Sequence, residues 1–163
     1  MSRDASIALI GVIMGLSGTV VMDIWAMFLR GVFKQPLPNW GAVGRWAAHL
    51  PTLFHADIGA VPAVKHETAI GWAVHYGVGI IYGVIFAVWA GPTWLVQPDF
   101  LPLWTFGLVT IAAGWFLLHP GLGLGWALSN TPNPTKGRVM GLVAHTVFAL
   151  GMWAPIVFLN FGV

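Results

Sequence analysis

Four long apolar stretches limit what this chain can fold into more than any other feature of its sequence. They run from about Ala5 to Leu29, Ala69 to Ala90, Leu103 to Leu128 and Val139 to Phe161. A helix rises about 1.5 Å per residue, so each stretch can cross a hydrocarbon layer of about 30 Å. The sequence therefore predicts an all-α polytopic membrane protein, a four-transmembrane-helix bundle in which residues 1–163 form a single membrane domain.

The third stretch is expected to break between residues 119 and 125. Pro120 disfavours helical geometry at His119 and removes a backbone donor, and three glycines follow it. The span then either ends at His119 or continues through a kink to about Leu128. A cavity beside the break and a simple helix end at the membrane surface are both compatible with this pattern.

The composition excludes several classes of function. The chain is 58% hydrophobic and 7% charged, whereas about a quarter of the residues in soluble domains are charged. The lipid bilayer is therefore the expected partner. Seven basic residues with no clustered basic face argue against nucleic acid as a partner. Because there is no cysteine, any metal would have to be held by histidine and carboxylate.

The distribution of basic residues predicts the orientation. Six of the seven Lys and Arg residues lie in the first and third loops, and only Arg3 lies on the other side. Short loops on the cytoplasmic side carry an excess of such residues. We therefore expect both termini on the periplasmic or exterior side, with the loop of residues 30–68 in the cytoplasm.

Part of the first loop is expected to form a short amphipathic helix, at residues 39–50, on the membrane surface. Trp40, Val43 and Trp46 gather on one face of it, while Arg45 and His49 project from the other. Such a helix suits the membrane interface.

Small residues at helical spacing mark the faces on which spans can pack closely. Gly11, Gly15 and Gly18 lie on one stripe of the first span, and Gly79 and Gly83 on one stripe of the second. Helices in lipid associate where small residues let backbones approach each other.

Each span carries one ionisable residue: Asp23, His75, His119 and His145. All four fall in the cytoplasmic half by sequence position. Such residues are costly inside a membrane and usually face a protein interior or a watery cavity. Three imidazoles and a carboxylate match the ligands of a divalent metal ion. They are also compatible with a haem or chlorophyll-type pigment held by histidine, with a proton relay, or with interhelical hydrogen bonds that only hold the bundle together.

A second group of polar residues lies in the first loop. Its members are Arg45, His49, His55 and Glu67, with Asp57 and His66 nearby. They are candidate cofactor-binding residues that would form a surface site or cap the intramembrane cluster. The alternative is that they are solvated loop residues.

Several motifs resemble a known family when they are taken together. They are Gly44-Arg45-Trp46-x-x-His49, Phe54-His55, Glu67, Gly71-Trp72-x-x-His75-Tyr76, Ser129-x-Thr131-Pro132 and Ala144-His145. The chain resembles, from its first span to its last, a bacterial family of small four-helix inner-membrane proteins of unknown function. The resemblance implies a location in the bacterial inner (plasma) membrane and no particular activity. It points to Asp23, Arg45, Trp46, His49, His55, Glu67, His75 and His145.

Three functional hypotheses follow. The first is a polar His/Asp site near the cytoplasmic face that binds a metal ion, haem or pigment, or passes an ion. The alternative is a non-catalytic accessory or structural subunit of a larger respiratory or photosynthetic membrane complex, or a homo-oligomer. A membrane enzyme acting on a lipid or quinone ranks last, because no nucleophile with an adjacent base is found.

Overall fold

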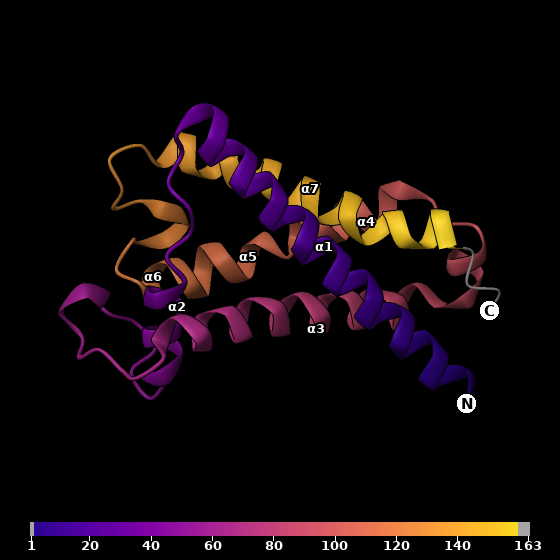
Figure 1. Cartoon of the computed structure of the whole chain (residues 1–163), viewed down its shortest axis with the longest axis horizontal. Helices are drawn as coiled ribbons and strands as arrows, with labels where there is room; N and C mark the ends of the chain where they lie inside the picture. Colours follow the sequence, from indigo (N-terminus) through magenta and orange to yellow (C-terminus); the bar gives the residue numbers. More distant parts are fainter. Residues whose placement is uncertain (1, 160–163) are drawn as a thin grey trace. The chain divides into compact units, whose positions relative to one another are not determined.

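The computed structural model describes residues 2–159, in which every regular element is a helix (Figure 1). In chain order these are α1 (Arg3–Phe33), α2 (Trp40–Ala48), η1 (Ile58–Ala60), α3 (Glu67–Val96), α4 (Phe100–Val109), α5 (Ile111–Ala113), η2 (Gly114–Leu118), α6 (His119–Gly121), η3 (Trp126–Leu128) and α7 (Pro134–Leu159). The prediction of an all-α four-helix membrane fold is confirmed.

Within residues 2–159, four helical segments are long and apolar enough to cross a membrane. They are α1, α3, the continuous run Phe100–Gly121, and α7. Large apolar side chains on them remain exposed, among them Val88, Val109 and Phe158. Exposed apolar side chains along such helices are what a multi-pass membrane protein presents to lipid tails.

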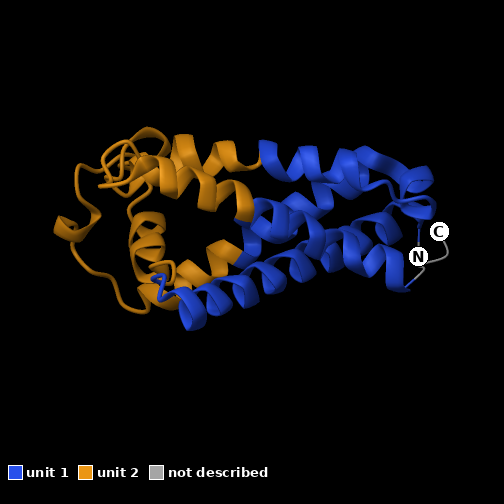
Figure 2. Ribbon diagram, turned by 90° about the horizontal axis from the view of Figure 1, so that it is seen from above, with its two compact units in different colours: residues 1–36, 76–109, 144–163 blue, residues 37–75, 110–143 orange. Residues whose placement is uncertain are grey.

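The chain divides into two compact units (Figure 2). Unit 1 comprises residues 1–36, 76–109 and 144–163, and unit 2 comprises residues 37–75 and 110–143. Helices α3 and α7 each contribute a segment to both units. The single membrane domain predicted from the sequence stays a prediction.

The core of unit 1 is built from apolar side chains of α1, α3, α4 and α7. Met14, Phe86, Leu103 and Met152 have no exposed surface. The Phe86 ring also lies 5.3 Å from the ring of Phe106, centroid to centroid. These contacts contribute mainly dispersion energy, because lipid tails are as apolar as the side chains themselves.

Helices α1 and α3 approach closely at glycines of unit 1. A Cβ atom on Gly11 would lie 2.6 Å from Val84 Cα, and one on Gly15 would meet the carbonyl oxygen of Gly79. A Cβ on Gly83 would meet the carbonyl oxygen of Gly11. The small residues picked out from the sequence therefore do allow close backbone contact.

The next glycine of the same stripe faces α7 instead. A Cβ on Gly18 would lie 2.7 Å from a side-chain carbon of Met152 and 2.8 Å from the ring of Phe148. From the other side, a Cβ on Gly151 would lie 2.8 Å from Gly18 Cα. One glycine stripe on α1 thus serves two neighbours.

Helix α3 contains a break at Gly91, where φ is 72° and ψ is 179°. Positive φ is readily adopted only by glycine. Helical geometry resumes at Pro92 and continues to Val96. Proline is tolerated in the first turn after the break because the N–H that it lacks would have no helical acceptor there.

The third span differs from the expectation at His119. This residue is helical, with φ −62° and ψ −47°, although Pro120 follows it. The turn before it, η2, is a π-helix in which the backbone N–H of His119 donates to the carbonyl of Gly114. We attribute the difference to this wider turn, because a proline in a regular α-helix clashes with the carbonyl four residues earlier. The helix ends at Gly121.

In unit 2, helix α2 packs backbone to backbone on the first turns of α3. A Cβ on Gly44 would meet the carbonyl oxygen of Glu67, and one on Gly71 would meet the carbonyl oxygen of Trp40. Val43 and Trp46 of α2 are buried, with 5% and 7% of their surface exposed. The predicted apolar face of α2 therefore packs on protein, while its place at the membrane surface stays a prediction.

The glycine contact between α1 and α3 can be tested with a matched pair of variants. Replacing Gly by Ala in a helix is intrinsically favourable by about 0.8–1.0 kcal/mol. At Gly77 a Cβ would meet nothing within 4 Å, whereas at Gly15 it would meet backbone. We expect Gly77→Ala to keep or raise the free energy of unfolding, and Gly15→Ala to lower it by about 1–3 kcal/mol through overpacking.

The measurement is the unfolding midpoint of the purified protein during titration with SDS in mixed micelles. Equal shifts for the two variants would show that the glycine contact does not hold the helices together.

Candidate functional site

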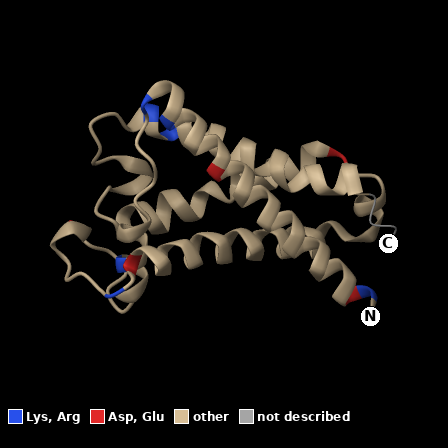
Figure 3. Ribbon diagram, viewed as in Figure 1, with Lys and Arg blue, Asp and Glu red and all other residues tan. Residues whose placement is uncertain are grey.

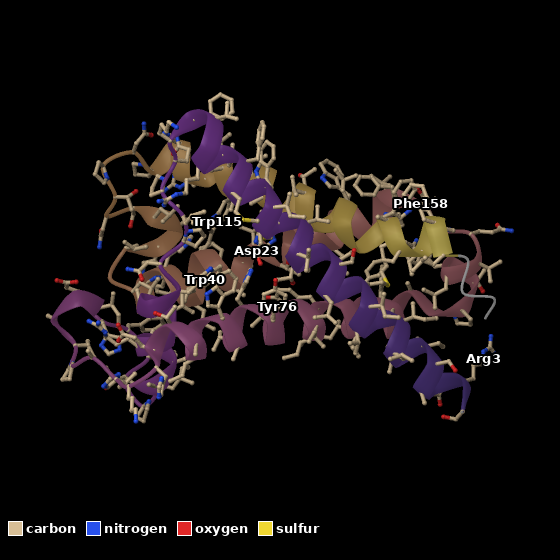
Figure 4. All side chains as sticks on the ribbon, viewed as in Figure 1. Arg3, Asp23, Trp40, Tyr76, Trp115 and Phe158 are labelled. Atoms are coloured by element: carbon tan, nitrogen blue, oxygen red, sulfur yellow. The ribbon has the colours of Figure 1, made fainter. Side chains whose placement is uncertain are left out.

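Asp23 is the only acidic residue in the middle of a span, and it is bound to a tyrosine of α3. The Tyr76 hydroxyl donates a hydrogen bond of 2.9 Å to Asp23 Oδ2. Both residues belong to unit 1, and Figure 4 shows their side chains directed toward each other between α1 and α3. A hydroxyl that donates to a carboxylate makes a charge-assisted hydrogen bond, which is stronger than a neutral one.

The packing of the two helices explains this pairing. Asp23 lies two helical turns after Gly15, and Tyr76 lies one turn before Gly79. Because Gly15 and Gly79 are in close contact and the helices run antiparallel, the polar pair follows from the glycine contact. Tyr76 was missed as a site residue, although a tyrosine beside His75 within an apolar span was a usable signal.

His145, also in unit 1, bonds across to α4. Its Nδ1 lies 2.9 Å from the carbonyl oxygen of Gly107. A carbonyl can only accept, so Nδ1 carries the proton and the lone pair of the neutral ring lies on Nε2. Nearby, the Trp104 indole N–H donates to Thr146 Oγ1 at 3.0 Å. His145 thus has a fixed tautomer and an interhelical bond, a geometry that also occurs in metal-ligating histidines.

His75 lies in unit 2 within an aromatic cluster. Its ring stacks on Trp40 with centroids 4.0 Å apart and an interplanar angle of 26°. Trp72 lies 5.8 Å from the same ring. Trp40 comes from the start of α2, so the contact between α2 and α3 also orients His75. The two tryptophans were not predicted as site residues.

His119 has a buried nitrogen without a hydrogen-bond partner. The atom is Nδ1, and the statement holds for residues 2–159. In the next turn, a Cβ on Gly121 would meet the indole nitrogen of Trp46. That same nitrogen donates to the carbonyl of Leu53 at 2.9 Å. Trp46 therefore holds the loop after α2 close to α6 within unit 2.

His55, in the first loop, is the second histidine of residues 2–159 with an unsatisfied ring nitrogen. Its Nε2 is buried and has no partner in the described part of the chain. The next residue, Ala56, lies against Gly123, since a Cβ on that glycine would meet the Ala56 carbonyl oxygen. The two imidazoles thus come from segments that pack on each other. Buried nitrogens without partners are rare, because each loses its bonds to water.

Arg45 and Glu67 form a two-pronged ion pair in unit 2. Arg45 Nε and Nη2 lie 2.9 Å from Glu67 Oε2 and Oε1. Nη1 of the same arginine makes longer contacts of 3.3–3.5 Å with the carbonyls of Ile58, Gly59 and Val61. The hydrogen bonds that Arg45 donates to the Glu67 carboxylate raise the pKa of Arg45 further above its ordinary value. The pair ties α2, the loop and the start of α3 together.

His49 is engaged locally. Its Nδ1 lies 2.8 Å from the carbonyl oxygen of Arg45, one turn earlier in α2. The predicted loop group of Arg45, His49, His55 and Glu67 is therefore gathered in unit 2, where three of its four members already have hydrogen-bond partners within the protein. Only His55 offers a buried nitrogen for another ligand.

No three His, Asp or Glu side chains within residues 2–159 are grouped so that they could hold a metal ion. Of the four predicted metal ligands, Asp23 and His145 belong to unit 1, and His75 and His119 belong to unit 2. That all four share one site stays a prediction.

A known protein family matches most of this chain. Residues 12–158 match the family described as "Protein of unknown function (DUF2938)". The chain belongs to this family. No curated protein and no solved structure matches the chain. The family resemblance inferred from the motifs is confirmed.

The Arg45–Glu67 pair gives a testable expectation for unit 2. Arg45→Lys keeps the charge but cannot make the two-pronged contact. We therefore expect residues 53–66 to be cleaved faster by protease in Arg45→Lys and in Glu67→Gln. Lys65→Gln is the control, because Lys65 is exposed and lies in the same loop. The measurement is limited proteolysis followed by mass spectrometry, and unchanged cleavage in Arg45→Lys would contradict the assigned role.

Proposed function

We propose that this chain is a multi-pass protein of the bacterial inner membrane that binds a cation, either a proton or a metal ion, at a polar site centred on Asp23. The observation that carries the proposal is the Asp23–Tyr76 hydrogen bond between α1 and α3. A carboxylate at this depth is costly unless its charge is neutralised or paired.

Neither α1 nor α3 places a lysine or arginine beside Asp23. No Lys or Arg lies between Arg3 and Arg30 in α1, and α3 contains none. The Tyr76 hydroxyl stabilises the carboxylate but brings no positive charge. The negative charge of Asp23 can be balanced by a proton, by an imidazolium or by a bound metal ion. If a proton or an imidazolium balances it, the site can carry a proton.

The position of Asp23 also suits exchange with one side of the membrane. Arg30 lies seven residues further along α1, which is about 10 Å at helical rise. A cation bound at Asp23 would therefore lie nearer to the end of α1 that carries Arg30 than to its N-terminus. In the proposed orientation that end is cytoplasmic.

The proposal is tested with Asp23→Asn and Tyr76→Phe in the full chain. We expect metal analysis of the purified protein, or proton flux into proteoliposomes containing a pH-sensitive dye, to give a signal that Asp23→Asn lowers at least tenfold. Tyr76→Phe should retain the signal and lower the free energy of unfolding by about 1 kcal/mol.

Two outcomes would contradict the proposal. If neither metal nor flux is found in the wild type, Asp23 only joins the helices. If Asp23→Asn is as active as the wild type, the cation binds elsewhere. Stable co-purification with a larger membrane complex, unaffected by Asp23→Asn, would favour the accessory-subunit alternative.

A second candidate function is ligation of a metal ion or haem-type group by imidazole in unit 2. It is favoured by the buried nitrogens of His55 and His119, which have no partner within residues 2–159. Two imidazoles match the axial ligands of a haem but are fewer than a structural zinc site needs. An absorption band or bound metal that disappears in both His55→Ala and His119→Ala, but not in Asp23→Asn, would distinguish it from the first.

The proposed orientation can be tested independently of the site. The chain has no cysteine, so a single introduced cysteine gives an unambiguous label. In right-side-out cells, we expect a membrane-impermeant maleimide to label Gln97→Cys, which lies in the second loop. Thr135→Cys, in the first turn of α7 beside the third loop, should be labelled only after lysis, and the reverse pattern would show that both termini are cytoplasmic.

A further inference from the structure

The C-terminal end of α1 forms an open basic groove in unit 1. The groove has a volume of about 580 Å³ and is lined by Met27, Arg30, Gly31, Lys34, Gln35 and Pro36. Figure 3 shows basic residues at this end of α1 and a single acidic residue in the middle of the helix. We call this feature the α1 groove.

Two like charges share the α1 groove. Arg30 lies in the last turn of α1 and Lys34 caps the helix in the left-handed conformation, so two positive charges line the same groove and repel each other. Neither has an acidic partner within the part of the chain that the structure describes. The nearest acid along the chain, Asp23, is bound to Tyr76. An anion between the two cations would remove their repulsion.

The donors that the groove can offer an anion are on side chains. The backbone N–H groups of Lys34, at φ 57°, and of Gln35 are already used, because both donate to the carbonyl of Leu29. Lys34 Nζ donates to the carbonyl of Gly31 at 3.0 Å, which leaves two of its three donors. The Arg30 guanidinium has five donors in a planar arrangement that matches a phosphate group. These groups favour an anion with several oxygens.

An apolar strip leads along α1 to the groove. Ile24, Met27 and Phe28 lie on one side of the helix and are 55%, 57% and 48% exposed. Arg30 follows directly after the long apolar stretch that ends at Leu29, so it lies at the depth of the lipid headgroups. An occupant would thus meet cations at one end and apolar side chains at the other.

We propose that the α1 groove binds the phosphate group of an anionic phospholipid, whose acyl chain lies along Ile24, Met27 and Phe28. Arg30 and Lys34 contact the phosphate oxygens. Gly31 provides the open space between them, because a Cβ at that position would meet nothing within 4 Å. The site does not depend on the cation site proposed at Asp23.

The test uses delipidated full-length protein in detergent, titrated with short-chain phosphatidylglycerol, phosphatidylcholine or inorganic phosphate and followed by native mass spectrometry. We expect phosphatidylglycerol to bind at least tenfold more tightly than the other two. Arg30→Gln and Lys34→Gln should each weaken its binding about fivefold.

A space-filling variant separates the groove from general charge. Gly31→Leu should fill the groove without a backbone clash and weaken phosphatidylglycerol binding at least tenfold while both cations remain. The matched controls are Gly77→Leu, where a Cβ also meets nothing within 4 Å, and Arg3→Gln at the other end of α1. Both should bind like the wild type.

Three results would overturn the proposal. Equal binding of phosphatidylcholine would show a non-specific lipid layer. Inorganic phosphate that binds as tightly as phosphatidylglycerol and displaces it would show a site for free phosphate. Wild-type affinity in both Arg30→Gln and Gly31→Leu would show that the lipid binds elsewhere.

Discussion

Backbone contact between α1 and α3 is the interaction on which unit 1 depends. Helices in lipid gain little by hiding apolar side chains from solvent, so short-range packing has to hold them together. Gly11, Gly15, Gly79 and Gly83 allow that packing by leaving no side chain between the two backbones. The same contact brings Asp23 and Tyr76 within hydrogen-bond distance, so the candidate site is a consequence of how the helices pack.

The polar residues of the chain divide into two kinds by what they touch. Arg45, Glu67 and His49 bond to one another or to nearby backbone, and their contacts organise the first loop and α2. His55 and His119 instead have buried nitrogens without partners in residues 2–159. A chain with so few polar groups uses most of them to position its own segments, which makes those two imidazoles informative exceptions.

The two proposals use different parts of α1 and different physical forces. At Asp23 the relevant energy is the cost of a charge inside the apolar layer, whereas in the α1 groove it is the repulsion between two cations at the edge of that layer. Both features follow from the placement of a few ionisable residues on one long helix. A single span can therefore serve both as a partner in helix packing and as a binding element for lipid.

The sequence by itself determined the number of spans, the helical class, the close-packing faces and the family. The first three follow from hydropathy and glycine spacing, and the family follows from short residue motifs; all of these are local properties of the chain. The break in the third span was also predictable near Pro120, although the π-helical turn that keeps His119 helical was not. Its geometry depends on how the backbone relieves the proline clash rather than on residue type alone.

Only the tertiary structure decided which polar residues meet. Hydropathy predicts similar depths for the four ionisable residues of the spans, but it leaves the rotation of each helix about its axis undetermined. The sequence therefore could not identify Tyr76 as a partner of Asp23, or Gly107 as a partner of His145. The sequence also could not show which polar residues of the first loop bind each other. In the structure Arg45 and Glu67 form an ion pair, whereas His55 has a buried nitrogen without a partner in the described part of the chain. Side-chain pairing depends on helix rotation and register, which are set by contacts between segments far apart in sequence.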